Sequence, residues 1–231
     1  MSSIAIIPAR GGSKRIPRKN IRDFCGKPMI AYSIEAALTS ALFSRVIVST
    51  DDAEIAEVSK AHGAEAPFRR PANLSDDHAT TSEVILHALR WLEEHQEMPD
   101  FLCCIYPTAP FLRQEYLREG FELVRTGKAV AAFSVTTYAY PIQRSLRIND
   151  EGLTEYMWPE YRETRSQDLP EAYHDAGQFY WYAAENFLGQ EGILSGGFPV
   201  ILPRYLVLDI DTPEDWIMAE RIFKAMAQAD A

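Results

Sequence analysis

Residues 4–20 read IAIIPARGGSKRIPRKN, and this stretch contains the two features that decide the fold class. The run from Ile4 to Ile7 is continuously apolar and is stopped by Pro8, which predicts a short strand buried on both faces. A glycine pair and a series of cations follow directly. Open α/β sheets bind their ligands at the carboxyl ends of the strands, so the sequence predicts a binding loop immediately after the first strand.

The charge of this loop is the reverse of the charge of the whole chain. Six cations and no acidic residue lie in the first 22 residues: Arg10, Lys14, Arg15, Arg18, Lys19 and Arg22. The 231 residues together carry 23 Lys and Arg against 33 Asp and Glu, a formal net charge of −10. That balance argues against a general nucleic-acid binder or a protein of anionic membrane surfaces. The loop favours a compact polyanion such as a nucleoside triphosphate, because backbone N–H groups at a glycine pair can approach an anion closely. Its spacing matches neither a Walker A loop nor GxGxxG, so no dinucleotide cofactor is expected. The alternative to a polyanion-binding loop is a basic loop that is simply solvated.

Short apolar runs alternate with amphipathic segments along the rest of the chain. Further strands are predicted at residues 46–48, 101–106, 129–135 and 205–210. Helices are predicted at residues 28–39, 53–62, 80–92 and 114–126, and from Thr212 onward with Trp216, Ile217, Phe223 and Met226 buried. Thr80 and Glu83 have the spacing of a capping box. The alternation predicts one α/β domain over residues 1–231, a mostly parallel sheet with helices on both faces.

Residues 137–178 interrupt this alternation, because they are rich in Tyr, Arg, Pro and Gln and follow neither period. A loop of this length without structure is improbable inside one domain, so we expect an insertion that packs on another body, such as a second subunit. The chain contains no apolar stretch near the roughly 18 residues that span a bilayer, and Met1–Ser3 lead directly into a strand. A cytoplasmic protein is therefore expected.

Asp209 and Asp211 are the candidate metal ligands. They stand two residues apart at the end of the strand predicted for residues 205–210, where alternate side chains share a face. Carboxylates that converge on one side repel unless a cation lies between them, and Mg²⁺ is bound by one or two carboxylates together with substrate phosphates. The alternative is that both residues are solvated groups ahead of the Thr212 helix cap.

These segments together resemble the nonulosonate cytidylyltransferases, the family of the CMP-sialic acid synthetases. The opening motif at residues 5–14 with PRKN at 17–20 carries the resemblance, which continues in order through residues 48–52, 70–71, 107–110 and 209–212. It implies a Rossmann-like sheet of the nucleotide-diphospho-sugar transferase type. It also implies transfer of CMP from CTP to the anomeric hydroxyl of a nine-carbon 2-keto sugar acid, with Mg²⁺ as cofactor and a homodimer whose arm is the 137–178 insertion.

The resemblance also implies roles for individual residues. The nucleotide would be bound by Arg10, Gly11, Ser13, Lys19, Asn20, Arg70 and Thr81. The metal would be held by Asp209 and Asp211, and the catalytic residues would be Arg10, Lys19 and Asp211. The sugar would be contacted by Tyr106, Arg165, Gln167 and Gln178, with the dimerisation arm closing over the pocket of the neighbouring subunit.

Within the family the likeness is strongest to the branch that acts on pseudaminic acid. It is carried by residues 66–71 (APFRRP), 74–77 (LSDD), 103–106 (CCIY) and 175–181 (DAGQFYW). The sialic acid enzymes have Gln in place of Tyr106. Three alternatives remain open: the same reaction on N-acetylneuraminic, legionaminic or Kdo-type acids, a nucleotidyltransferase that loads a sugar 1-phosphate, and a non-catalytic nucleotide-binding module.

Overall fold

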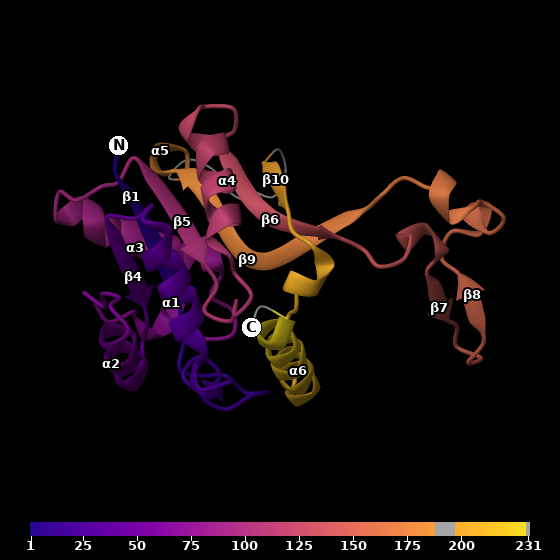
Figure 1. The fold of residues 1–231 in the computed structure, drawn as a ribbon, viewed down its shortest axis with the longest axis horizontal. Helices are drawn as coiled ribbons and strands as arrows, with labels where there is room; N and C mark the ends of the chain where they lie inside the picture. The colour runs from indigo at the N-terminus through magenta and orange to yellow at the C-terminus, as the bar shows by residue number, and fades with distance from the viewer. Residues whose placement is uncertain (188–196, 230–231) are drawn as a thin grey trace.

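The strand predicted at Ile4–Ile7 forms as β1 (Ser3–Pro8) inside a six-stranded sheet with the order β10-β6-β9-β5-β1-β4 (Figure 1). The computed structural model describes residues 1–187 and 197–229. β1 pairs in parallel with β4 and β5, and β10 pairs in parallel with β6, whereas β9 runs antiparallel to both of its neighbours. The mostly parallel sheet is thus confirmed. The other strands of the sheet are β4 (Arg45–Ser49), β5 (Phe101–Ile105), β6 (Ala131–Thr137), β9 (Tyr173–Ala183) and β10 (Phe198–Ile201).

Helices cover both faces of this sheet, as its continuously apolar strands require. Ala5 and Ile7 face the cluster formed by α1, α2 and α4, while Ile4 and Ile6 face α3 and α5. The helices are α1 (Met29–Ser40), α2 (Ala53–Ala61), α3 (Thr81–Glu94), α4 (Gln114–Arg125), α5 (Ala184–Phe187) and α6 (Pro213–Ala229). The capping box predicted for Thr80 and Glu83 is present at the start of α3. No helix in the described ranges is long and apolar enough to cross a membrane.

The strand predicted for residues 205–210 is wrong. A 3-10 turn (Arg204–Leu206) follows Pro203, and the chain then runs irregularly to Asp211. Leu206 and Ile210 are buried because they pack beneath α6 and the first loop, in a third cluster with Trp216. The alternation of apolar residues in this segment therefore results from burial under a helix and not from pairing in a sheet. Ile217 was also assigned wrongly, since half of its side chain is exposed on the outer side of α6.

The insertion extends away from the sheet as an arm (Figure 1). It carries an antiparallel pair, β7 (Leu146–Ile148) and β8 (Thr154–Tyr156), between short 3-10 turns at 142–144, 159–161 and 166–168. Residues 173–178 of the predicted insertion belong instead to β9, which leads from the arm back into the sheet. A small pair of strands, β2 (Asp23–Phe24) and β3 (Lys27–Pro28), and a turn at 72–74 complete the described elements.

Candidate active site

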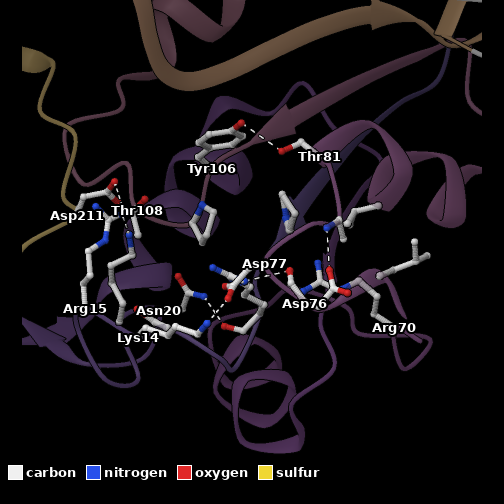
Figure 2. A pocket seen from close by; sticks show the side chains of 18 residues that line it. Lys14, Arg15, Asn20, Arg70, Asp76, Asp77, Thr81, Tyr106, Thr108 and Asp211 are labelled. Atoms are coloured by element: carbon white, nitrogen blue, oxygen red, sulfur yellow. Dashed lines mark hydrogen bonds and ion pairs between the residues drawn. The ribbon is translucent and has the colours of Figure 1, made fainter. Parts of the chain in front are cut away.

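A cavity of about 540 Å³ opens at the carboxyl end of the sheet (Figure 2). Its walls are the loop after β1, the loop that leads into α3, and the residues that follow β5. The predicted site residues that line it are Arg10, Ser13, Lys19, Asn20, Arg70, Thr81, Tyr106 and Asp211. Segments far apart in the sequence therefore meet at the edge of the sheet where a ligand was expected.

The cations of the first loop meet carboxylates inside the cavity. Arg10 donates to Asp77 Oδ1 at 2.6 Å, and Lys14 is hydrogen-bonded to the other oxygen of the same carboxylate. Arg15 contacts Asp211 at 2.5 Å, and Lys19 lies 3.2 Å from the second oxygen of Asp211. These ion pairs hold the cations in defined directions, and five cationic residues against three acidic ones leave the lining net positive.

Two of the six cations counted in the sequence point away from the cavity. Arg18 forms ion pairs with Asp52 and Glu54, and its hydrogen bond to Asp52 lowers the pKa of that carboxyl to about 2. The guanidinium of Arg22 lies 4.8 Å from the centre of the Trp216 ring. Arg18 and Arg22 thus fix the first loop against α2 and α6. Only four of the six cations in the first 22 residues line the cavity.

Gly11 is a packing residue rather than a lining residue. Its backbone N–H donates to Asp51 Oδ1 at 3.0 Å, and a Cβ built on Gly11 would lie 2.7 Å from Asp52 Oδ2. Side-chain Nδ2 of Asn20 donates to the Arg10 carbonyl at 2.9 Å and so fixes the loop from its other end. The glycine therefore lets the loop lie directly on the carboxylate that caps α2.

Arg70 is the most buried cation of the cavity, with 4% of its surface exposed. Its guanidinium lies 3.7 Å from Asp51 and donates to Ser75 Oγ at 3.1 Å. Burial lowers the pKa of Arg70, but a guanidinium remains protonated at neutral pH. Because Asp51 also accepts from the Gly11 N–H, one carboxylate links Arg70 to the first loop.

Tyr106 and Thr81 meet on the wall formed by the end of β5 and the start of α3 (Figure 2). The Thr81 hydroxyl lies 3.2 Å from the Tyr106 hydroxyl. The ring of Tyr180 lies 5.3 Å from that of Tyr106, centre to centre, and its hydroxyl donates to Asp175 at 2.6 Å. Burial raises the pKa of Tyr106, which therefore presents a protonated phenol to the cavity.

Asp211 lines the cavity and Asp209 does not. Burial and the negative charge of Asp211 raise the pKa of Asp209, so the two carboxylates lie close enough to interact. No cluster of three or more His, Cys, Asp or Glu side chains that would hold a metal occurs in residues 1–187 and 197–229. Two carboxylates nonetheless suit Mg²⁺, which takes its remaining ligands from phosphates and water.

The other predicted sugar contacts lie outside the cavity of their own chain. Arg165 and Gln167 belong to the arm, at the turn of residues 166–168. Gln178 lies on β9 with 4% of its surface exposed, and its Nε2 donates to the Leu206 carbonyl at 2.5 Å. Sequence reasoning gave no role to Asp76, Asp77 and Thr108, which do line the cavity. Charge complementarity between the Asp76–Asp77 pair and the first loop is the signal that would have found the two carboxylates.

The fold and the site together define a nucleotidyltransferase type of α/β protein, with a cationic cavity at the carboxyl edge of the sheet. Residues 4–193 match the family model described as cytidylyltransferase, and the chain belongs to this family. It is 46% identical over 226 residues, 97% of each chain, to a pseudaminic acid cytidylyltransferase of Campylobacter jejuni. It is 32% identical, over 99% of each chain, to the CMP-N,N'-diacetyllegionaminic acid synthase of Legionella pneumophila.

The arrangement of the sheet and helices is shared with a solved CMP:2-keto-3-deoxy-manno-octonic acid synthetase in complex with CTP. The two superpose with a TM-score of 0.69, and the match covers 99% of this chain and 100% of the other. Because the sequence identity is 22%, this likeness concerns the fold alone. It confirms the predicted fold class.

Proposed function

We propose that the protein transfers CMP from CTP to the anomeric hydroxyl of pseudaminic acid and releases pyrophosphate. The observation that carries the proposal is the 46% identity to a pseudaminic acid cytidylyltransferase over nearly the full length of both chains. The cavity supports it independently, because it combines five cationic residues with three carboxylates at the ligand-binding edge of the sheet.

The cationic residues of the cavity would bind the triphosphate and stabilise its departure. Arg10 and Lys14 lie on the first loop, and Arg70 faces the cavity from the loop before α3. Charge accumulates on pyrophosphate as the bond to the α-phosphorus breaks, and preformed cationic donors stabilise that charge without reorganising. Positioning and electrostatics then provide most of the catalysis, and no covalent enzyme intermediate is needed.

Lys19 and Asp211 are the residues that we place next to the reacting phosphate. Lys19 Nζ donates to the Ile210 carbonyl at 2.8 Å and lies 3.2 Å from Asp211, so the two side chains are held together on one wall. Asp211 with Asp209 would hold Mg²⁺. When bound, the metal supplies charge neutralisation at the phosphates and acidifies a coordinated hydroxyl. Ser13 and Asn20 complete the nucleotide contacts in this proposal.

Tyr106 is the sugar-contacting residue that we propose within the same chain. Its phenol is oriented by Thr81 from one side and packs against Tyr180 on the other. A protonated phenol so placed can donate to a carboxylate or hydroxyl of the sugar acid. Its position on the cavity wall supports a role in distinguishing one sugar acid from another.

The remaining sugar contacts, Arg165 and Gln167, are proposed to act across a homodimer. The arm presents exposed apolar side chains, among them Tyr140, Ile148 and Leu153, which are 84%, 75% and 59% exposed. Side chains of this kind gathered on one projection are typical of an interaction surface. If the arm of one copy packed on a second copy, Arg165 and Gln167 of the first copy would lie near the cavity of the second.

The test is an acceptor panel. The protein is incubated with CTP and Mg²⁺ and, separately, pseudaminic, N,N'-diacetyllegionaminic, N-acetylneuraminic and Kdo acids, and each CMP-sugar is identified by mass. We expect the largest kcat/KM with pseudaminic acid. A larger value with another acid would overturn the proposed acceptor. Absence of pyrophosphate release with every acid would favour a non-catalytic nucleotide-binding protein.

A further inference from the structure

The segment from Leu206 to Asp211 carries the proposed metal ligands, yet it belongs to no strand. Individual contacts hold it in place: Lys19 donates to the Ile210 carbonyl, the Asp211 N–H donates to Asp215 Oδ2 at 3.1 Å, and Leu206 and Ile210 are buried under α6. Sheet pairing would have fixed every second residue by backbone hydrogen bonds. Here the position of Asp211 depends on a few side chains.

One of these side chains is Gln178, and an irregularity in β9 determines its direction. The pairing of β6 with β9 shifts between Phe133 and Val135, so that residues 176–179 lie opposite Ser134. Gly177 adopts φ +61° within this bulge. Ser134 Oγ accepts from the backbone N–H groups of Gln178 and Phe179 at 3.3 and 3.2 Å. Bulges of this kind redirect a side chain out of the alternation of the strand.

The redirected Gln178 side chain reaches the Leu206 carbonyl, to which its Nε2 donates at 2.5 Å. Its Oε1 is buried and has no hydrogen-bond partner among the residues that the structure describes. A buried amide with an unsatisfied oxygen costs stability, and an apolar residue of this size would avoid the cost. The same residue also accepts from the Tyr106 N–H through its backbone carbonyl, at 2.9 Å.

We propose that Gln178 is a positioning residue that ties the Leu206–Asp211 segment to β9. By this tie the Asp211 carboxylate stays beside Lys19 and Arg15 on the cavity wall, while the Gln178 backbone carbonyl fixes Tyr106, another lining residue. The role differs from the sugar contact that the family resemblance implied for Gln178, since its side chain faces Leu206 and not the cavity. The catalytic part of this inference rests on the proposed function, whereas the structural part does not.

The structural part is tested by amide hydrogen exchange on the full chain without substrate. Gln178→Met keeps the length of the side chain and removes the donor. We expect the Leu206 and Val207 amides to exchange roughly tenfold faster, as on loss of one buried hydrogen bond that limits a local opening. The matched control is Thr136→Val, because Thr136 Oγ1 donates at 2.8 Å to the carbonyl of Leu202, earlier in the same connection. That variant should speed exchange near Leu202 and leave the Leu206 and Val207 amides unchanged; equal effects of the two variants at Leu206 and Val207 would overturn the proposal.

The catalytic part is tested by separating kcat from KM. Arg10, Lys14 and Arg70 lie on other segments, so we expect Gln178→Met to keep the KM for CTP within about twofold while kcat falls about tenfold or more, since small displacements of a reacting group cost rate. A kcat equal to that of Thr136→Val, or a loss confined to the KM of the sugar acid, would overturn the positioning role. If the parent protein itself fails to turn over CTP, the proposed function is wrong. The hydrogen-exchange experiment still shows whether Gln178 holds the Leu206–Asp211 segment.

Discussion

Adjacent glycines in the first loop provide a sharp test of how that loop is built. Gly11 and Gly12 are neighbours in the sequence, yet an added Cβ would meet very different surroundings. At Gly11 it would lie 2.7 Å from Oδ2, 3.1 Å from Cβ and 3.2 Å from Cγ of Asp52. At Gly12 it would meet no atom within 4 Å.

Asp52 cannot move aside freely, because both of its oxygens are used. Oδ1 caps α2 by accepting from the Ile55 N–H at 3.0 Å, and Oδ2 accepts from Arg18. Gly11→Ala must therefore displace either the loop or a capped ion pair. We expect a loss of about 1–3 kcal/mol, the usual cost of overpacking, against less than about 0.5 kcal/mol for Gly12→Ala, as at open surface sites.

Thermal unfolding of the two variants measures this difference. For a chain of this size 1 kcal/mol corresponds to a Tm shift of roughly 2–4 °C, so Gly11→Ala should melt several degrees below both the parent and Gly12→Ala. The KM for CTP should rise in Gly11→Ala alone, because the displaced loop carries Arg10. Equal melting temperatures for the two variants would refute the packing argument.

Three further substitutions follow from the site. Asp211→Ala frees Lys19 and Arg15 and removes a proposed metal ligand, so turnover at saturating Mg²⁺ should fall about 100-fold or more with an unchanged circular dichroism spectrum; activity within a fewfold of the parent would exclude the role. Arg10→Ala should raise the KM for CTP, and unchanged kcat and KM would contradict its place in the triphosphate site. The Asp52 pKa of about 2 lies below the ordinary value, so the stability that Asp52 contributes is present above about pH 4 and is lost as the pH falls toward 2. Unfolding curves of Asp52→Asn should therefore fall below those of the parent at pH 7 and converge with them near pH 2; a difference independent of pH would contradict this.

Local sequence patterns predicted the central fold well, because they report local physics. The apolar run at 46–48 became β4, and the capping-box residues Thr80 and Glu83 start α3 as their spacing indicated. The strand predicted at residues 205–210 was wrong for a physical reason. Leu206 and Ile210 are buried by α6 rather than by neighbouring strands, and periodicity alone does not separate the two kinds of burial.

The candidate site was predicted less completely, because its geometry depends on contacts between distant segments. The pairing of Arg10 with Asp77 joins residues 67 positions apart, and that of Arg15 with Asp211 joins residues 196 apart. Composition gave the charge of the first loop but not the diversion of Arg18 and Arg22 toward α2 and α6. The bulge that turns Gln178 toward Leu206 has no signal in the sequence beyond Gly177.

The carboxylates that accompany the cavity cations have a consequence for how ionic strength acts on nucleotide binding. A triphosphate that binds Arg10 and Lys14 would displace the protein's own Asp77 from them rather than dissolved anions. Simple salts screen exposed charges and compete at bare cationic surfaces. CTP affinity should therefore fall with added salt less steeply than the number of cations in the cavity alone would predict. The net charge of the lining residues should set the salt dependence. The protein supplies its own counterions, and we expect the cavity to favour ligands that bring several negative charges at once.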